Sequence, residues 1–148
     1  LFNFFNKIYL GDAGSYLISF LSAFFLLDFI SKNDLISPYF ICLLLWYPAF
    51  ENFFSIIRRV FSKKKLDKPD QKHLHQMIYS FLSYNKLLNK RHTNTATGII
   101  INLFNVIILF FSYKYYLVTE SLVIFILFNI SIYLLLYFFI KKQLNHFN

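Results

Sequence analysis

The sequence has a single cysteine, Cys42, and few charged residues. One cysteine excludes a disulfide-stapled scaffold. Charged residues make up only 15% of the 148 residues, against about 25% in soluble globular domains, which excludes a disordered chain and an ordinary soluble domain. Three glycines exclude a collagen-like chain. Instead, 57% of the residues are hydrophobic, with 21 Phe and 11 Tyr. Because a chain of this length cannot bury so many aromatic side chains in its own core, the composition predicts a membrane protein.

Four apolar stretches predict the fold class, an all-α membrane protein with four transmembrane helices. They cover about residues 15–30, 36–57, 96–112 and 121–140, and about 20 apolar residues cross a bilayer as a helix. The first stretch is long enough only if Lys32 snorkels outward. Residues 58–95 form a long loop, in which residues 77–88 predict an amphipathic helix at the membrane surface. We treat residues 1–148 as one integral membrane domain.

The distribution of basic residues predicts the orientation of these helices. Of the 15 Lys and Arg, ten lie in the loop 58–95, three more fall on the same side of a four-helix topology, and two fall opposite. The three are Lys7, Lys141 and Lys142, and the two are Lys32 and Lys114. The positive-inside rule therefore places the start of the chain, the long loop and the tail in the cytoplasm. The net charge of +8 thus indicates topology and attraction to anionic lipid or diphosphate, and we predict no nucleic-acid partner.

The chain begins with Leu1, and its single methionine is Met77. We therefore expect a piece of a longer polytopic protein. The first ten residues lack the pattern of a signal peptide.

A first motif, Gly11–Ser15, combines a carboxylate with two of the three glycines just before the first apolar stretch. Glycine lets other groups approach the backbone closely, and Ser15 is suited to cap the following helix, whose free N–H groups favour anions. The Asp12 carboxylate there suits Mg²⁺ carrying phosphate. The alternative is a capped turn that enters a helix.

A second motif, residues 68–76, contains two histidines. Pro69 keeps its predecessor out of the helical region, and in an extended segment His73 and His75 project to the same side. They are then directed at one ligand, with Leu74 set against the membrane, and could bind phosphate, bind metal or move a proton. A structural zinc site is a poor alternative because no cysteine lies nearby. Two surface histidines in a basic loop are the other alternative.

A third motif surrounds Glu51, which lies inside the second apolar stretch, where charge is costly. Glu51, Ser55 and Arg58 share one helical stripe that we expect to face the cytoplasmic cavity. Pro48 is expected to kink the helix. An interfacial Glu paired with a lysine of the loop is the alternative.

Other polar residues of the spans are expected to be structural. Asp28 and Lys32 form an i,i+4 pair, and Asn102, Asn105 and Asn129 are helix-packing contacts.

The order of these motifs resembles a known family. The segment 7–15, the pattern Pro-x-x-Glu-Asn at 48–52 with Ile-Ile-Arg-Arg at 56–59, and Pro-Asp-x-x-His-x-His at 69–75 look like the C-terminal half of the polyprenyl-phosphate glycosyl-1-phosphate transferases. That family includes the initiating enzymes of O-antigen, enterobacterial common antigen and teichoic acid linkage synthesis, and the phospho-MurNAc-pentapeptide translocase of peptidoglycan synthesis.

The resemblance implies an enzyme of the bacterial inner membrane with a cytoplasmic active face. It implies transfer of a HexNAc-1-phosphate from a UDP-sugar to undecaprenyl phosphate, with release of UMP, as the first step of cell-surface polysaccharide synthesis. By resemblance, the catalytic residues are Asp12, His73 and His75, with Asp12 at the Mg²⁺ (or Mn²⁺). The substrate-binding residues that we predict from the same motifs are Lys7, Gly11, Gly14, Ser15, Glu51, Arg58 and Asp70.

The sequence departs from the family's pattern at three points. Its seven acidic residues include no adjacent pair, whereas the family carries an Asp-Asp pair on an upstream loop, so this chain alone should be incomplete and inactive. Gln76 stands where many relatives have a further histidine, and Glu51 stands where aspartate is usual. The run His-Leu-His-Gln favours the UDP-HexNAc branch over the translocase, which typically has three consecutive histidines.

Two alternative functions, from other classes of protein, remain open besides the enzyme. One is a non-catalytic membrane remnant or assembly partner, which the reading frame upstream of Leu1 would distinguish. The other is a small transporter, which predicts charge at mid-depth of the spans. It is disfavoured because Asp28 and Glu51, the only candidates, lie near span ends.

Overall fold

A computed structural model describes residues 11–62, 72–85 and 89–147 of the chain. The described residues form helices without strands: α1 (Gly11–Ser31), α2 (Pro38–Leu44), α3 (Trp46–Phe61), α4 (Leu74–Tyr84), α5 (Lys90–Ser112), the short 3₁₀ helix η1 (Tyr113–Tyr115) and α6 (Thr119–Phe147). The predictions for Lys7 and Asp70 lie outside the described residues.

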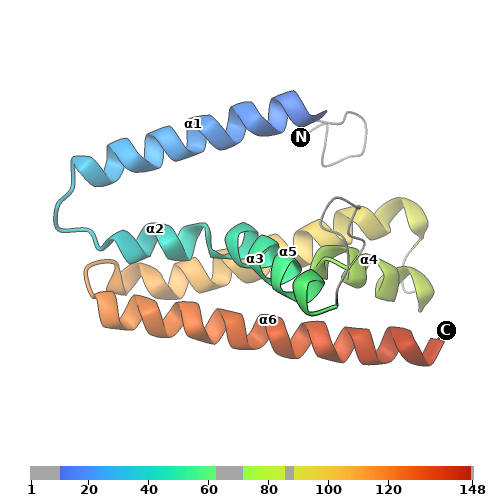
Figure 1. The fold of residues 1–148 in the computed structure, drawn as a ribbon. Helices are drawn as coiled ribbons and strands as arrows, with labels where there is room; N and C mark the ends of the chain where they lie inside the picture. Colours follow the sequence, from blue (N-terminus) through green and yellow to red (C-terminus); the bar gives the residue numbers. More distant parts are fainter. Residues whose placement is uncertain (1–10, 63–71, 86–88, 148) are drawn as a thin grey trace.

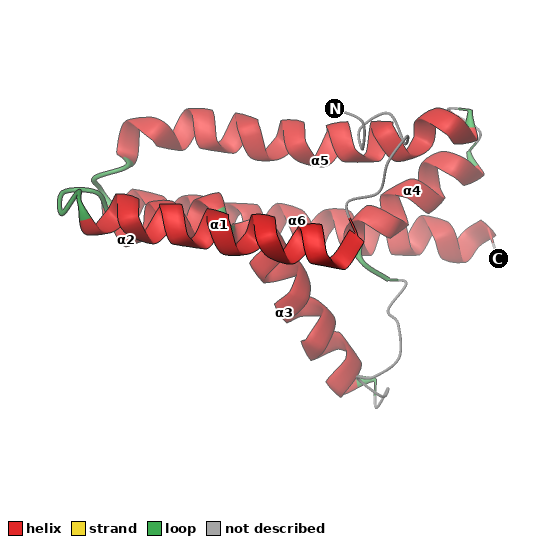
Figure 2. Ribbon diagram, turned by 90° about the horizontal axis from the view of Figure 1, so that it is seen from above, coloured by secondary structure: helices red, strands yellow, loops and turns green. Residues whose placement is uncertain are grey.

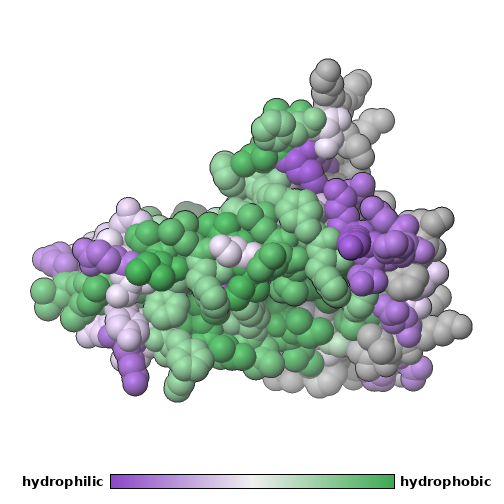
Figure 3. Space-filling model, turned by 90° about the horizontal axis from the view of Figure 1, so that it is seen from below, coloured by the Kyte–Doolittle hydropathy of each residue, from purple (hydrophilic) through white to green (hydrophobic). Residues whose placement is uncertain are grey.

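Three of these helices are long and apolar enough to cross a membrane: Gly11–Ser31, His92–Tyr115 and Thr119–His146. Together α2 and α3 are also long and apolar enough, but they are bent by 70° where they meet, so the described residues provide three spans, or four if this pair crosses as one broken span. The all-α membrane fold expected from the sequence is therefore confirmed, although α1, α5 and α6 extend beyond the predicted boundaries. In Figure 3 a broad hydrophobic zone separates hydrophilic surfaces at the two ends of the molecule, as a multi-pass membrane protein requires.

The second apolar stretch is bent by 70° about one turn before Pro48, which confirms the kink expected from the sequence. Leu45 interrupts it, with φ −100° and ψ 6°, and α3 then leaves the bundle at a steep angle (Figure 2). Pro48, three residues later, explains the position of the break. A proline ring clashes with the carbonyl four residues earlier, here that of Leu44, and offers it no N–H. The helix therefore ends at Leu44 and a new one begins at Trp46. In the first turn of α3 the same proline is tolerated, since N–H groups there have no partner within the helix.

α6 is the central helix of the bundle, because it contacts α2, α4 and α5. Its buried residues Leu122, Tyr133, Tyr137 and Ile140 pack in one cluster with Leu43, Trp46, Leu74, Met77, Ile78 and Ile108. α1 stands apart in Figure 1 and has no buried residue. The core thus lies among α2 to α6, and α1 presents apolar side chains all round.

Polar contacts connect the helices at the end of the molecule that carries the α1–α2 and α5–α6 turns. Ser37 caps α2, accepting from the Tyr39 amide at 3.4 Å, and its hydroxyl lies 2.9 Å from that of Thr119. The Ser37 amide also donates to the Tyr116 carbonyl at 3.1 Å. These bonds join the α1–α2 turn to the α5–α6 turn.

The predicted structural roles of polar side chains are confirmed for Asp28 and Asn105. Asp28 pairs with Lys32 at 2.7 Å, and Asn105 accepts from the Trp46 indole at 2.9 Å. Asn129 is fully buried in α6, and its amide has no hydrogen-bond partner in the described part of the chain.

Candidate functional site

The two histidines lie side by side where α4 begins. His73 is the N-cap, with extended backbone angles (φ −71°, ψ 148°), and its amide donates to the Gln76 side-chain oxygen at 3.3 Å. The His73 and His75 rings stack with centroids 5.5 Å apart and planes 14° from parallel. The sequence correctly predicts two neighbouring imidazoles, although His75 already belongs to the helix.

Leu74 and the rest of α4 differ from the expectation. Leu74, Met77 and Ile78 are buried against α5 and α6 and do not face the membrane. A helix does form in the region predicted at 77–88, but α4 begins at Leu74 and ends at Tyr84, and residues 86–88 lie outside the described residues. Its apolar face covers the protein's own core. The histidine pair is consequently fixed to the bundle.

Glu51 forms a hydrogen bond with the first residue of α4. The side chain is only 6% exposed, and its Oε1 accepts from the Leu74 amide at 2.6 Å and from the Tyr133 hydroxyl at 3.0 Å. The same oxygen lies 3.3 Å from His73 Nδ1. The Glu51–Ser55 stripe therefore faces the protein interior, where both residues are buried, in contrast to the expected cytoplasmic cavity.

Arg58, two turns further along α3, reaches the same segment. Its guanidinium donates to the Lys72 carbonyl and, at 2.6 Å, to the Tyr137 hydroxyl. It also lies over the Phe54 and Tyr137 rings, 6.0 and 5.6 Å from their centroids. Sequence reasoning missed Tyr133 and Tyr137, and the available signal was their spacing of four residues on α6, which places two hydroxyls on one face.

A polar groove lies beside His75, between α4 and the start of α5. It has a volume of about 440 Å³ and is lined by His75, Gln76, Tyr79, Ser80, Asn94 and Thr97. Desolvation lowers the pKa of the His75 imidazole, the neighbouring His73 lowers it further, and the Glu51 carboxylate opposes both effects. The lowered pKa favours the neutral imidazole, which can accept as well as donate a hydrogen bond.

Asp12 lies in the first turn of α1 and is exposed. Gly11, before it, has φ 68°, a conformation that favours glycine. Because α1 begins at Gly11, Ser15 is inside the helix and its hydroxyl donates to the Gly11 carbonyl at 2.9 Å. The expectation that Ser15 caps the helix is thus wrong. Gly14 is half-buried in the same turn.

The first turn of α1 and the start of α4 lie at the same end of the molecule (Figures 1 and 2). The catalytic assignments of Asp12, His73 and His75 remain predictions, as do the substrate-binding ones. Within the described ranges no three His, Cys, Asp or Glu side chains group closely enough to hold a metal ion. Mg²⁺ commonly needs only one or two carboxylates besides substrate phosphates, and an exposed carboxylate such as Asp12 fits that demand.

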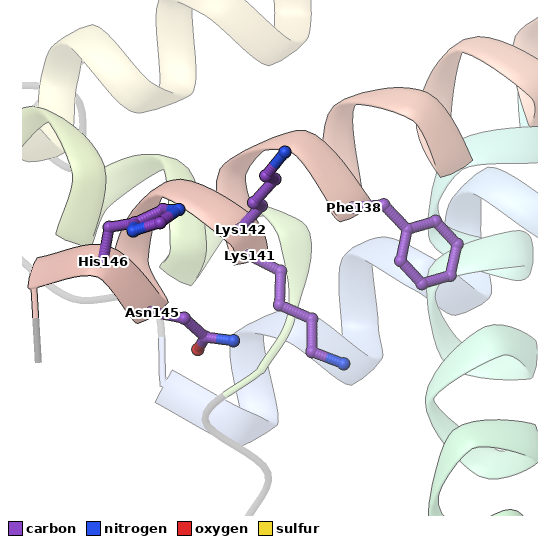
Figure 4. Close-up of a pocket in the computed structure, with 5 residues that line it drawn as sticks. All are labelled: Phe138, Lys141, Lys142, Asn145 and His146. Atoms are coloured by element: carbon purple, nitrogen blue, oxygen red, sulfur yellow. The ribbon is translucent and has the colours of Figure 1, made fainter.

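The same end carries basic side chains from α6. Lys141, Lys142 and His146 line a shallow hollow of about 330 Å³ with Phe138 and Asn145 (Figure 4). Cations at a helix C-terminus interact favourably with its dipole. This cluster adds to the positive charge around the candidate site.

Comparison with curated proteins gives one informative match. The chain is 34% identical over 79 residues to a Bacillus subtilis (strain 168) protein named "Probable undecaprenyl-phosphate N-acetylglucosaminyl 1-phosphate transferase". The match covers 51% of this chain and 21% of the relative. No family model matches the chain, and no solved structure matches it.

This match agrees with the resemblance carried by the three motifs, and it is limited to part of a longer relative. The chain is accordingly similar, over these 79 residues, to about a fifth of a protein that is named as a glycosyl-1-phosphate transferase.

Proposed function

We propose that the complete gene product transfers a HexNAc-1-phosphate from a UDP-sugar to undecaprenyl phosphate. In this reaction an oxygen of the lipid phosphate attacks the β-phosphorus of the UDP-sugar. The bond from that phosphorus to the bridging oxygen breaks, and UMP leaves. The reaction takes place at the cytoplasmic face of a bacterial inner membrane and starts the synthesis of a cell-surface polysaccharide. The observation that carries the proposal is the similarity to the Bacillus subtilis protein, whose name states such a transfer.

The geometry of the described residues is compatible with this chemistry. Phosphoryl transfer depends mainly on positioning and on neutralising the charge of phosphate oxygens. Asp12 would hold Mg²⁺ together with diphosphate oxygens, and the metal would supply charge neutralisation there. His73 and His75 would contact the phosphates or the sugar, since both rings stand at the start of α4 on a rigid core. The other partners that we propose are membrane lipid and the rest of the same protein.

The translocase of peptidoglycan synthesis is the alternative substrate branch. The run His73-Leu74-His75-Gln76 favours the UDP-HexNAc branch, because the translocase typically has three consecutive histidines. A supply of purified UDP-HexNAc and UDP-MurNAc-pentapeptide to the same preparation distinguishes the two branches. We expect exchange of UMP only with the first.

The direct test of the proposal is UMP exchange by the complete gene product in membranes that contain undecaprenyl phosphate. We expect labelled UMP to enter the UDP-sugar in the wild type. Asp12→Asn should abolish this exchange while the protein still inserts into membranes. The matched control is Asp28→Asn, at the other end of the same helix, where the carboxylate pairs only with exposed Lys32. Its exchange should equal that of the wild type.

Normal exchange by Asp12→Asn would remove the carboxylate from the metal role. Absence of exchange in the wild type, with correctly inserted protein and both UDP-sugars supplied, would favour the non-catalytic remnant or assembly partner. In that case a stop codon just upstream of the frame would identify the remnant.

A further inference from the structure

Two hydrogen-bonded pairs connect α3, α6 and the segment that carries the histidines. In the first, Tyr133 donates to Glu51, and Glu51 accepts from the Leu74 amide. In the second, Arg58 donates both to Tyr137 and to the Lys72 carbonyl. The two pairs therefore bind the backbone on both sides of His73, at the Lys72 carbonyl and at the Leu74 amide.

The two hydrogen-bonded pairs lie next to each other because of the spacing of their residues. Glu51 and Arg58 are seven residues apart and share one face of α3, and Tyr133 and Tyr137 are four apart and share one face of α6. The two tyrosine rings stack with centroids 6.3 Å apart and planes 9° from parallel. Both are almost fully buried, at 2% and 1% exposure, so their hydroxyls have little freedom to move.

The burial of Glu51 argues for a structural partner over a mobile ligand. A buried carboxylate is costly unless hydrogen bonds compensate it. Glu51 Oε1 receives two such bonds, and Oε2 is buried without a hydrogen-bond partner among the described residues. One of the two donors to Oε1 is the amide of Leu74, the first residue of α4, which has no acceptor within its own helix. The carboxylate thus completes the N-terminus of α4 and fixes its position relative to α3.

We propose that Glu51 and Arg58, backed by Tyr133 and Tyr137, form a positioning clamp that sets the placement of His73 and His75. This inference rests on the proposed function, and it assigns Glu51 and Arg58 a role through the histidines in place of the direct substrate contact that the sequence predicts. The four clamp residues come from two helices, α3 and α6, and hold the start of a third, α4, so movement of α3 relative to α6 would shift the imidazoles.

Kinetics of the complete gene product separate positioning from substrate contact. Misplacing a reacting group by about 1 Å costs up to about 100-fold in rate. Glu51→Ala should therefore lower the turnover number by roughly 10–100-fold, the effect typical of residues that orient a ligand, with the KM for UDP-sugar within about twofold of wild type. Loss of a direct ground-state substrate contact would instead raise KM with unchanged turnover.

Conservative variants test the same inference without deleting volume. Glu51→Gln keeps an acceptor for the Leu74 amide, and it should retain more turnover than Glu51→Ala. Tyr133→Phe and Tyr137→Phe remove only a hydroxyl and should each lower turnover by a smaller factor. The control is Tyr113→Phe, an exposed ring in η1, after the C-terminal end of α5, with no expected change.

Hydrogen exchange supplies a readout that does not depend on activity. In Glu51→Ala the amides of residues 73–77 should exchange faster, whereas those in the middle of α5 should keep their wild-type protection. The control Glu120→Ala removes an exposed carboxylate from the first turn of α6 and should leave both regions unchanged. If Glu51→Ala does not fold, Tyr133→Phe replaces it in the same measurement.

Local loss of protection together with lower turnover is the expected result. Unchanged exchange at residues 73–77, or a raised KM with normal turnover, would overturn the clamp. An inactive wild type would contradict the proposed function alone, because the exchange measurement still decides whether the clamp holds the α4 start.

Discussion

The hydrogen bond from the Trp46 indole to Asn105 joins α3 to α5 within apolar surroundings. Trp46 is 5% exposed, so removal of its acceptor leaves a buried N–H without a partner. Such a group costs about 1–3 kcal/mol. Asn105→Ala should lower the free energy of unfolding by this amount, as measured by denaturant unfolding in detergent.

Asn102→Ala is the matched control for that experiment. Asn102 lies one turn earlier on α5, is exposed, and donates only to the Gly98 carbonyl of its own helix. Exposed substitutions of this kind usually change stability by no more than about 0.5 kcal/mol. Equal effects of the two variants would contradict the structural role of Asn105.

The lowered pKa of His75 predicts how stability depends on pH. The unfolded chain binds a proton at the ordinary histidine pKa of about 6.5, and the folded protein binds it only at lower pH. Between those values the unfolded state carries more protons, so stability falls as pH falls below about 6.5. Thermal unfolding in detergent at pH 7.5, 6.5 and 5.5 should show this loss, and His75→Gln should reduce it. An identical pH dependence in the variant would refute the assignment.

The 70° bend between α2 and α3 can be tested by substitution of Pro48. Because Pro48 sets the position of this bend, Pro48→Ala should restore an N–H for the Leu44 carbonyl and permit a straighter span. Spin labels on Cys42, the only cysteine and exposed, and on a cysteine at Phe61, 84% exposed, report the geometry. Their separation, measured by pulsed electron spin resonance, should lengthen in Pro48→Ala.

Pro38→Ala is the control for the bend. Pro38 is the first residue of α2, where a missing N–H has no consequence, so the label separation should stay at its wild-type value. A separation that is unchanged in both variants would show that tertiary contacts alone set the bend.

The sequence predicts which segments form helices better than it predicts how those helices bend and pack. Long apolar runs predict α1, α5 and α6 because length and hydropathy alone determine whether a helix suits a bilayer. Pro48 predicts a kink near Leu45, but the sequence does not show whether the helix bends there or ends and begins again. Likewise the 77–88 periodicity predicts a helix with one apolar face, but only the packing decides whether lipid or protein covers that face.

At the candidate site, too, the sequence predicts local features but not contacts between distant residues. The neighbouring imidazoles follow from local chain geometry, and the sequence predicts them. The partners of Glu51 do not, because Leu74 is 23 positions away and Tyr133 is 82, and no local pattern reports such distant contacts. The sequence therefore indicates which groups could carry chemistry and misses what holds them in place.

At the scale of the whole molecule, the charge distribution predicts a single orientation in the membrane. In a Cys42→Ser background, Ser80→Cys on α4 and Leu117→Cys in the α5–α6 turn place one exposed thiol at each end of the bundle. A membrane-impermeant maleimide should label the first only in inside-out vesicles and the second only in right-side-out vesicles. Labelling of both thiols from one side would contradict the four-span topology.

The proposed function requires that Asp12 and the histidine pair act at one site. Mn²⁺ added with UDP-sugar to the complete gene product, labelled at the histidine side chains, tests it directly by paramagnetic broadening of the His73 and His75 resonances. We predict strong broadening in the wild type and in Asp28→Asn, and its loss in Asp12→Asn. Sharp histidine resonances in the wild type, or broadening that survives in Asp12→Asn, would contradict the claim.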